Sequence, residues 1–174
     1  LTYERLRRTN PRLIYCHITG YGPESAEANR AAYDVGAFWA RAGVAASLTP
    51  AGAEPPLQRG GMGDHMTGSN AAGASSAALF HRERTGEGQK VAVSLTRIGV
   101  YMMGWDVNTQ LRANLPSMPP HARENAPNPL INSFRDSEGR WFWLLMLQGD
   151  RHWPDFLQAL GAPPELAEDP RFVD

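Results

Sequence analysis

The chain has 174 residues, of which 42% are hydrophobic and 20% charged, a composition typical of one globular domain of ordinary size. Its formal net charge is -1 and its arginines are spread along the sequence, which argues against a nucleic acid or an anionic membrane surface as a partner. No apolar run is long enough to span a bilayer, and the first residues lack the pattern of a signal peptide.

The single cysteine, Cys16, excludes an internal disulfide and favours a reducing, cytoplasmic setting. It lies in the apolar run RLIYCHITGYG, where we expect a small, buried core residue. The chain begins at Leu1 without an initiator methionine and ends in a turn bounded by proline, so we expect an internal fragment of a longer protein.

The first 45 residues predict a helix, a strand and a second helix. YERLRRTNP is typical of the end of an amphipathic helix, because the residue before a proline, Asn10, avoids helical geometry. RLIYCHITGYG predicts a strand and a turn, and the loop at the carboxyl end of such a strand is where open α/β sheets bind ligands. Residues 31–45 predict a helix whose apolar face carries Val35, Phe38, Trp39 and Ala42.

A loop, a small-residue helix, a strand and a further helix are predicted next. Residues 46–63 are rich in proline and glycine, which indicates a loop. Residues 64–84 predict a helix of small side chains, which we expect to be buried because such residues allow close backbone approach, and Gly86 and Gly88 end it. QKVAVSL predicts a strand, and residues 96–113 predict a helix that is apolar at Ile98, Met102, Met103 and Trp105.

A connector with five prolines, residues 113–130, changes the character of the chain. Beyond it, INSFRDSEGRWFWLLML predicts a hairpin whose apolar second strand we expect to belong to a core, and residues 150–161 predict a helix. We therefore expect residues 1–100 to form part of a large domain, residues 101–122 a linker helix and proline-rich crossing segment, and residues 123–174 the start of a small domain.

RGGMGDHMTG, residues 59–68, places Asp64 among glycines just before the small-residue helix. One interpretation is an N-cap, since aspartate oxygens accept the free N–H groups of a first helical turn. The other is a nucleophile, because the partial positive charge of a helix N-terminus favours an ionised carboxylate, which can attack an acyl group. Gly61 and Gly63 leave room for a substrate in that case. From position alone, the cap is the stronger interpretation.

Other catalytic patterns are absent from the sequence. The five histidines are His17, His65, His81, His121 and His152. They show no helical metal-site spacing and no accompanying cysteine cluster, so we expect no metal. His65 adjoins Asp64 and could point into the same cleft, although a capping or solvated histidine is the simpler interpretation. There is no G-x-S-x-G elbow, and RTGEGQ lacks the lysine of a P-loop.

A family resemblance rests on five stretches that occur in order along nearly the whole chain: NPRLIYCHITGYG, AAYDVGAFWARAG, GDHMTGSNAAGASSAALFHRERTGEGQKVAVSL, NPLINSFRDSEGRWFWLLML and WPDFLQALG with DPRF. Together they resemble the class III CoA-transferase family, which includes carnitine-type CoA transferases and the related α-methylacyl-CoA racemases. The Gly-Asp turn with the small-residue helix and HRERTGEGQ is the most specific part.

The resemblance implies that Asp64 corresponds to the family's catalytic aspartate. That carboxylate attacks an acyl-CoA thioester, becomes an aspartyl-CoA thioester through a mixed anhydride, and passes CoA to a free carboxylic acid. The resemblance implies no permanently bound cofactor, because the coenzyme A thioester is a substrate. The cofactor-binding candidates near its thioester end are Thr19, Gly20, Tyr21, Gly63 and His65, although a plain strand-end turn would also account for Tyr21.

Two positions depart from the racemase branch. Racemases carry a histidine where this chain has Tyr33 and a glutamate where it has Gln148. Proton exchange at an α-carbon requires titratable groups on both faces, so transfer is favoured over racemisation. PPHARENAPNPL has no glycine, so the glycine-rich active-site loop of some transferases is absent or different here. The alternatives are an α-methylacyl-CoA racemase or isomerase and a non-catalytic, truncated CoA-binding relative.

The resemblance also implies an α/β fold. The chain is expected to contain part of a Rossmann-like large domain, followed by the start of a smaller α/β domain. Two full-length chains are expected to form an interlocked homodimer. The expected partners are an acyl-CoA and a small carboxylic acid, with no nucleic acid and no membrane.

Overall fold

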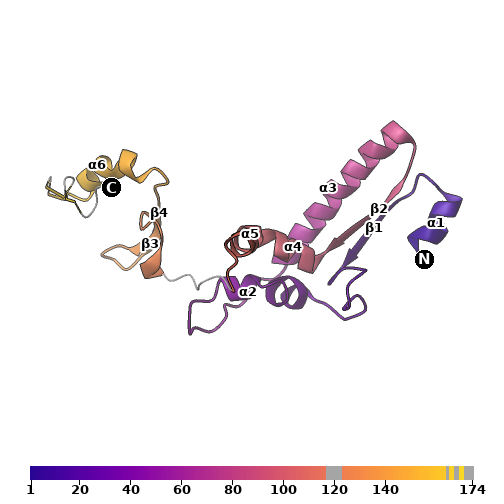
Figure 1. The fold of residues 1–174 in the computed structure, drawn as a ribbon, viewed down its shortest axis with the longest axis horizontal. Helices are drawn as coiled ribbons and strands as arrows, with labels where there is room; N and C mark the ends of the chain where they lie inside the picture. The colour runs from indigo at the N-terminus through magenta and orange to yellow at the C-terminus, as the bar shows by residue number, and fades with distance from the viewer. Residues whose placement is uncertain (117–122, 164, 167–168, 171–174) are drawn as a thin grey trace. The chain divides into compact units, whose positions relative to one another are not determined.

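The computed structural model describes residues 1–116, 123–163, 165–166 and 169–170. Helices and strands are mixed in these residues, which confirms the α/β class, and the chain divides into two compact units, Leu1–Pro120 and His121–Asp174 (Figure 1). No helix in the described residues combines the length and the apolar character needed to cross a membrane.

The first unit combines a pair of strands with several helices. In chain order its elements are α1 (Tyr3–Thr9), β1 (Ile14–Thr19), the π-helix η1 (Val35–Ala40), α2 (Val44–Ser47), α3 (Met62–Thr85), β2 (Gln89–Ser94), α4 (Leu95–Met102) and α5 (Gly104–Ala113). α1 ends at Asn10, whose N–H donates to the carbonyl of Leu6, as expected for a residue that precedes proline.

β1 and β2 are parallel, with Cys16 opposite Val91 and Thr19 opposite Ser94. Parallel neighbours need a long crossover connection, and here it runs through η1, α2 and α3. α3 lies along both strands (Figure 1). The predicted order of strand, small-residue helix and strand is confirmed.

The small residues of α3 bury one stripe of the helix. The buried positions are Gly63, Thr67, Ala71 and Ala78. The prediction that the helix as a whole is buried therefore holds only for this stripe in the described residues. Gly86 ends the helix with a left-handed φ of +78°, and its N–H donates to the carbonyl of Arg82 at 2.8 Å, as predicted for a C-terminal glycine.

The core of the first unit is built around η1. It consists of Ala37, Phe38, Trp39, Val44, Leu95 and Ile98. Phe38 is fully buried, and the indole N–H of Trp39 donates to the carbonyl of Pro56 at 3.2 Å. A buried indole usually finds such an acceptor, and this one ties the proline-rich loop before α3 to the core.

Two predicted helices are interrupted in the structure. Residues 31–45 form η1 and the short α2, separated at Gly43, whose φ of +90° is readily adopted only by glycine. Residues 96–113 contribute to α4 and α5, which are separated at Met103, where ψ is 11° and the backbone leaves helical geometry. A period of 3.6 in the apolar residues does not report such single-residue breaks.

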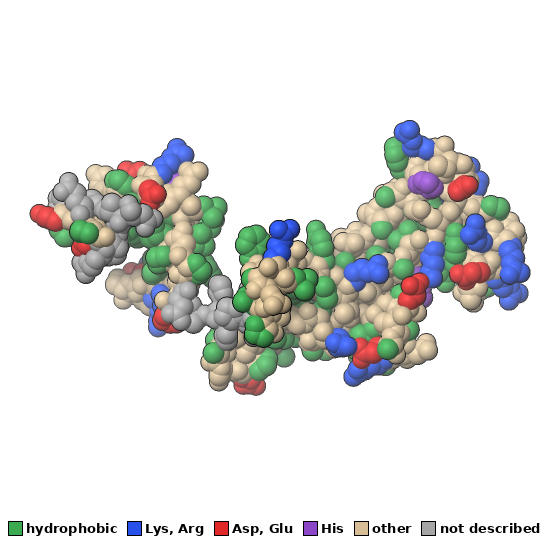
Figure 2. Space-filling view, viewed as in Figure 1, with side chains coloured by type: hydrophobic (Ala, Val, Ile, Leu, Met, Phe, Trp, Pro, Cys, Tyr) green, Lys and Arg blue, Asp and Glu red, His purple; other side chains and the backbone are tan. Residues whose placement is uncertain are grey.

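One residue predicted to be buried and two residues at apolar positions of predicted helices are exposed. Cys16 is exposed on β1, and Val35 and Trp105 are 53% and 82% exposed. The expectation of burial is wrong for Cys16, and no described element covers the faces on which the three side chains lie. Hydrophobic side chains are exposed on the surface of each unit (Figure 2).

The second unit contains the predicted hairpin and helix. Its elements are the 3-10 helix η2 (Arg123–Asn125), β3 (Ile131–Arg135), β4 (Trp141–Leu145) and α6 (Gly149–Ala159). In the turn, Asp136 accepts the N–H groups of Glu138 and Arg140 at 2.9 and 2.8 Å. The hydrogen bond from the Arg140 guanidinium, with these backbone bonds, lowers the pKa of Asp136 below its usual 3.8. The expectation that β4 is a core strand is wrong in the described residues, since Trp143 is 74% exposed.

Candidate functional site

Asp64 lies in the first turn of α3 without capping it. The N-cap is Gly61, with a left-handed φ of +80°, and Asp64 is the third helical residue. Its side chain is exposed, and no hydrogen bond or ion pair reaches its carboxylate among the residues that the structure describes. The N-cap interpretation is therefore wrong, and the carboxylate oxygens are open to a ligand beside the positive end of the helix dipole.

Asp34 supplies the cap that Asp64 does not. The backbone N–H of Gly63 donates to both carboxylate oxygens of Asp34 at 3.1 Å. The first four N–H groups of an α-helix have no intrahelical acceptor, so this contact satisfies one of them. Sequence reasoning missed it because capping rules consider only residues next to the helix. The available signal was an acidic residue directly before the apolar run VGAFWA.

Gly63 is buried where α3 approaches η1 most closely. A Cβ atom on Gly63 would lie 2.2 Å from Oδ1 of Asp34 and 2.3 Å from Cγ of Phe38, distances that real side chains do not show. Gly63 was predicted to bind the cofactor. The structure gives it a packing role directly before Asp64, with its N–H already donated to Asp34.

The loop after β1 contains the other predicted binding residues. Oγ1 of Thr19 accepts the N–H of Gly22 at 3.1 Å, which closes the turn. A Cβ atom on Gly20 would lie 2.1 Å from Cβ of Ala32, so the two backbone segments pass very close to each other. Tyr21 is partly buried against the core cluster. These residues therefore form an ordered turn against the core.

Thr96 connects this loop to η1. Its N–H and its hydroxyl lie 3.0 and 3.1 Å from the carbonyl oxygen of Gly20, and the hydroxyl also lies 3.1 Å from that of Ala37. The loop after β1 and the segment that caps α3 are thus parts of one hydrogen-bonded structure. Sequence reasoning did not identify Thr96, because no local pattern distinguishes it.

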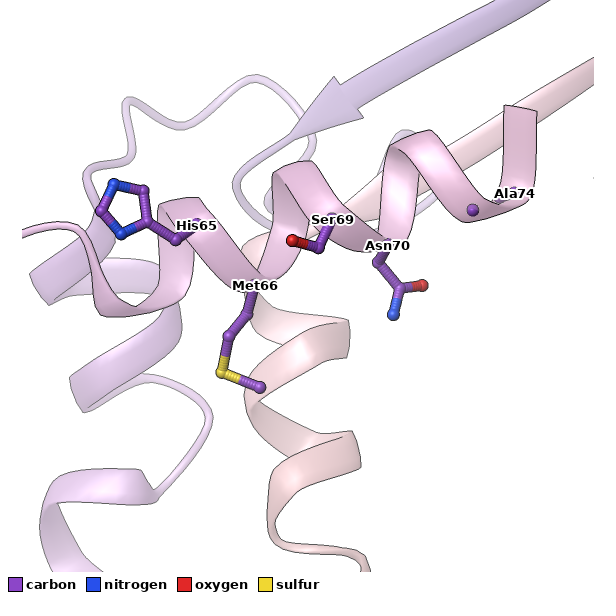
Figure 3. Close-up of a pocket in the computed structure, with 6 residues that line it drawn as sticks. His65, Met66, Ser69, Asn70 and Ala74 are labelled. Carbon is purple, nitrogen blue, oxygen red and sulfur yellow. The ribbon is translucent and has the colours of Figure 1, made fainter. Parts of the chain in front are cut away.

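His65 lies beside a groove along α3. The imidazole of His65 lies close to Gly61. A Cβ atom added to Gly61 would lie 3.1 Å from Cε1 of His65. A groove of about 670 Å³ runs along one face of α3 and is lined by His65, Met66, Ser69, Asn70, Gly73 and Ala74 (Figure 3). Asp64 is not among these residues. This groove therefore does not bring the two side chains together, and a cleft shared by His65 and Asp64 stays a prediction.

The residues that depart from the racemase pattern lie in different units. Tyr33 is 81% exposed and directly precedes Asp34. Gln148 precedes α6 in the second unit, and its Oε1 accepts a hydrogen bond from the Arg151 guanidinium at 3.2 Å.

No group of three or more histidine, cysteine or acidic side chains in the described residues could hold a metal ion.

The segment between the first strand's loop and Asp34 is held by Glu27. Its carboxylate accepts hydrogen bonds from the guanidinium groups of Arg41, at 2.8 Å, and of Arg30. The bond from Arg41, followed by that from Arg30, lowers the pKa of Glu27 below its usual 4.5. Arg30 also lies over the ring of Tyr21, 5.7 Å from its centroid. The segment is thereby tied both to η1 and to the loop after β1.

Acid is expected to loosen this segment. A carboxylate whose pKa is lower in the folded state stabilises the fold above its unfolded pKa, about 4.5, and this stabilisation is lost as the pH falls through the folded value. In hydrogen exchange corrected for the intrinsic rate, we expect protection of residues 22–34 to be complete at about pH 6 and to fall as the pH drops below about 4.5. Glu27→Gln should lack this protection at the higher pH, whereas the exposed Glu24→Gln control should match the wild type. Equal profiles for all three proteins would contradict the expectation.

Comparison with known proteins gives a consistent result over the whole chain. The family model described as CoA-transferase family III matches residues 1–174. The chain is 31% identical over 169 residues to (R)-2-hydroxy-4-methylpentanoate CoA-transferase of Clostridioides difficile, covering 97% of this chain and 42% of the relative. It is 33% identical over 172 residues to cinnamoyl-CoA:phenyllactate CoA-transferase of Clostridium sporogenes, covering 99% of this chain and 42% of the relative.

A solved structure shows the same similarity. The crystal structure of a CAIB/BAIF family protein from Brucella suis superposes with a TM-score of 0.77 at 28% sequence identity, covering 99% of this chain and 44% of that one. The chain thus spans less than half the length of the relatives that it matches, at about 42% of the two transferases.

Proposed function

The chain belongs to CoA-transferase family III, and on that premise we propose that the full-length protein moves coenzyme A from an acyl-CoA thioester to a free carboxylic acid, with Asp64 as the covalent nucleophile. The observation that carries the proposal is the state of Asp64 itself. Its carboxylate is exposed in the first turn of a long helix and is free of hydrogen bonds within the described residues, while Asp34 accepts the N–H of Gly63.

The chemistry proceeds in four exchanges at three carbonyl groups: those of the donor, of Asp64 and of the acceptor. The Asp64 carboxylate attacks the thioester carbonyl of the donor and the C–S bond breaks. CoA departs as the thiolate, and a mixed anhydride of Asp64 with the donor's acyl group remains. The thiolate then attacks the Asp64 carbonyl and releases the donor acid, which leaves an aspartyl-CoA thioester. The acceptor carboxylate attacks that thioester and forms a second anhydride with release of thiolate. Attack of the thiolate on the acceptor's carbonyl completes the transfer and regenerates Asp64.

The residues around Asp64 are assigned to substrate positioning in this proposal. Thr19, Gly20 and Tyr21 would face the thioester end of CoA, because their loop lies at the carboxyl end of a parallel strand. Gly63 sets the approach of α3 to η1, and His65 borders the groove along α3. No permanently bound cofactor is needed, since CoA enters and leaves as part of the substrates.

The assembly belongs to the same proposal. The parallel β1–β2 pair with its helical crossover is compatible with part of a Rossmann-like large domain. The chain covers 42% of the two transferase relatives, so the rest of the large domain and the interlocked homodimer are proposed for the full-length protein, together with its cytoplasmic location.

Trapping the covalent intermediate tests the proposal directly. The full-length protein is incubated with a panel of acyl-CoA thioesters and then treated with hydroxylamine or borohydride. Hydroxylamine should convert Asp64 to a hydroxamate, and borohydride should reduce its thioester to an alcohol. Peptide mass spectrometry should find these changes at Asp64 and not at Asp106, the third residue of α5.

An unmodified Asp64 with every donor that is turned over would overturn covalent transfer. Deuterium uptake at the substrate α-carbon without any acid acceptor would instead support racemisation. That outcome would require proton donors at other positions, because this chain has Tyr33 and Gln148 where racemases carry their histidine and glutamate.

A further inference from the structure

We infer that Asp34 is the positioning residue of the site: it caps α3 from outside the helix and thereby keeps the Asp64 carboxylate free to react. The inference rests on the function proposed for Asp64. It deepens that proposal by assigning a role to a second acidic side chain, which touches the helix and not the substrate.

The cap is a contact of two carboxylate oxygens with one backbone N–H. Both carboxylate oxygens of Asp34 lie 3.1 Å from the N–H of Gly63, the residue directly before Asp64. The contact spans 29 positions in the sequence and therefore connects two separate elements. Hydrogen bonds from backbone N–H groups to an ionised carboxylate are among the stronger hydrogen bonds in proteins. Asp34 thus fixes the backbone on which Asp64 is carried.

Asp34 is itself anchored by the core of the first unit. It directly precedes η1, whose residues Ala37 and Phe38 are completely buried. Phe38 packs against Gly63 so closely that a Cβ atom there would approach its ring carbon to 2.3 Å. Asp34 and the start of α3 are therefore held by the same core, and a shift of one would move the other.

Asp34 and Asp64 are both acidic side chains near the free N–H groups at the start of α3. An acidic side chain at the third position of a helix can reach back to a free N–H near the helix start, as in a capping box. Asp64 occupies this position, yet it makes no such bond in the described residues. Without Asp34, the N–H of Gly63 would lose its acceptor, and Asp64 would be the acidic side chain of the first turn left to compete for the free N–H groups. A capped Asp64 would have fewer lone pairs available for attack on a thioester.

The test measures adduct formation at Asp64 in variants of the full-length protein. Asp34→Ala removes the acceptor, while Asp34→Asn has nearly the same size and keeps one acceptor oxygen. We expect Asp34→Ala to slow the single-turnover formation of the Asp64 adduct by about 10- to 100-fold, as displacement of a reacting group commonly does. KM for the acyl-CoA should change by less than about threefold, because Asp34 does not contact substrate. Asp34→Asn should restore the rate to within about fivefold of the wild type.

The controls separate this inference from the proposed function. Absence of an adduct at Asp64 in the wild type would overturn the proposed function. If the wild type forms the adduct and Asp34→Ala forms it at the same rate, only the positioning role would be overturned. A slow Asp34→Asn variant would also overturn it, because the acceptor alone should suffice. Asp106→Ala, which alters the corresponding position of α5, should leave adduct formation unchanged.

If Asp34→Ala does not fold, hydrogen exchange of the Gly63 amide in the wild type tests the capping by Asp34. The N–H of Gly63 belongs to the first turn, where amides normally exchange freely because they lack an intrahelical acceptor. The inference requires this amide to be protected by at least about tenfold relative to its intrinsic exchange rate. A Gly63 amide that exchanges at its intrinsic rate would overturn the inference.

Discussion

The Asp64→Asn substitution is expected to lower kcat/KM for CoA transfer in the full-length protein by about 10⁴-fold or more, as removal of a covalent nucleophile does in other enzymes. Asparagine has nearly the same size, but its amide cannot form the anhydride on which transfer depends. The side chain is exposed and has no hydrogen bond or ion pair in the described residues, so the thermal unfolding midpoint should stay close to that of the wild type. Steady-state kinetics and a thermal unfolding scan check both expectations.

A matched control separates the nucleophile from the charge at a helix start. Asp106 is also the third residue of its helix and the acidic residue of its first turn. Asp106→Asn therefore removes the same favourable interaction with a helix dipole. We expect its kcat/KM to equal that of the wild type. If Asp64→Asn keeps more than about a tenth of the activity, Asp64 is not the covalent nucleophile.

The Gly63→Ala substitution is expected to lower the free energy of unfolding by about 2 to 4 kcal/mol, through overpacking and disturbance of the Asp34 hydrogen bond. The added Cβ atom would lie 2.2 Å from Oδ1 of Asp34 and 2.3 Å from Cγ of the buried Phe38. Neither neighbour is free to retreat, since Phe38 belongs to the core and Asp34 precedes it on the same segment. Urea unfolding of the full-length protein measures the change, and adduct formation at Asp64 should slow with it.

Two further glycines of α3 provide the control for Gly63. A Cβ atom on Gly68 or on Gly73 would meet nothing within 4 Å. Alanine is the better helix former by about 0.5 to 1 kcal/mol, so Gly68→Ala and Gly73→Ala should be neutral or stabilising. A cost for Gly63→Ala no larger than that for Gly68→Ala would show that α3 does not approach η1 as closely as described.

Much of the fold could be predicted from the sequence because local patterns carry it. The β-branched and aromatic residues of RLIYCHITGYG predict β1, the run QKVAVSL predicts β2, small side chains ended by glycines predict α3, and DSEG predicts the hairpin turn of the second unit. The interruptions at Gly43 and Met103 could not be predicted, because each depends on the backbone angles of one residue. The exposure of Trp105 and Trp143 could not be predicted either, since an apolar pattern does not report whether another element covers it.

The candidate site, like the fold, could be predicted from the sequence only in part. Asp64 could be identified from its neighbours in the sequence and from the family resemblance, both of which depend on contiguous residues. Its capping role was the stronger interpretation from position alone, and the structure assigns that role to Asp34. The hydroxyl of Thr96 and the close packing of Gly63 were likewise not predictable, because their partners lie far away along the chain.

The sequence by itself determined the order of strands and helices, the family and the acidic residue at the start of α3, because neighbouring residues are sufficient to specify each of these. Only the tertiary structure decided which carboxylate caps that helix and which remains free. The reason is physical: a free backbone N–H takes whichever acceptor the packing brings within reach. Packing of Phe38 against Gly63 brings Asp34 to that position from 29 residues away.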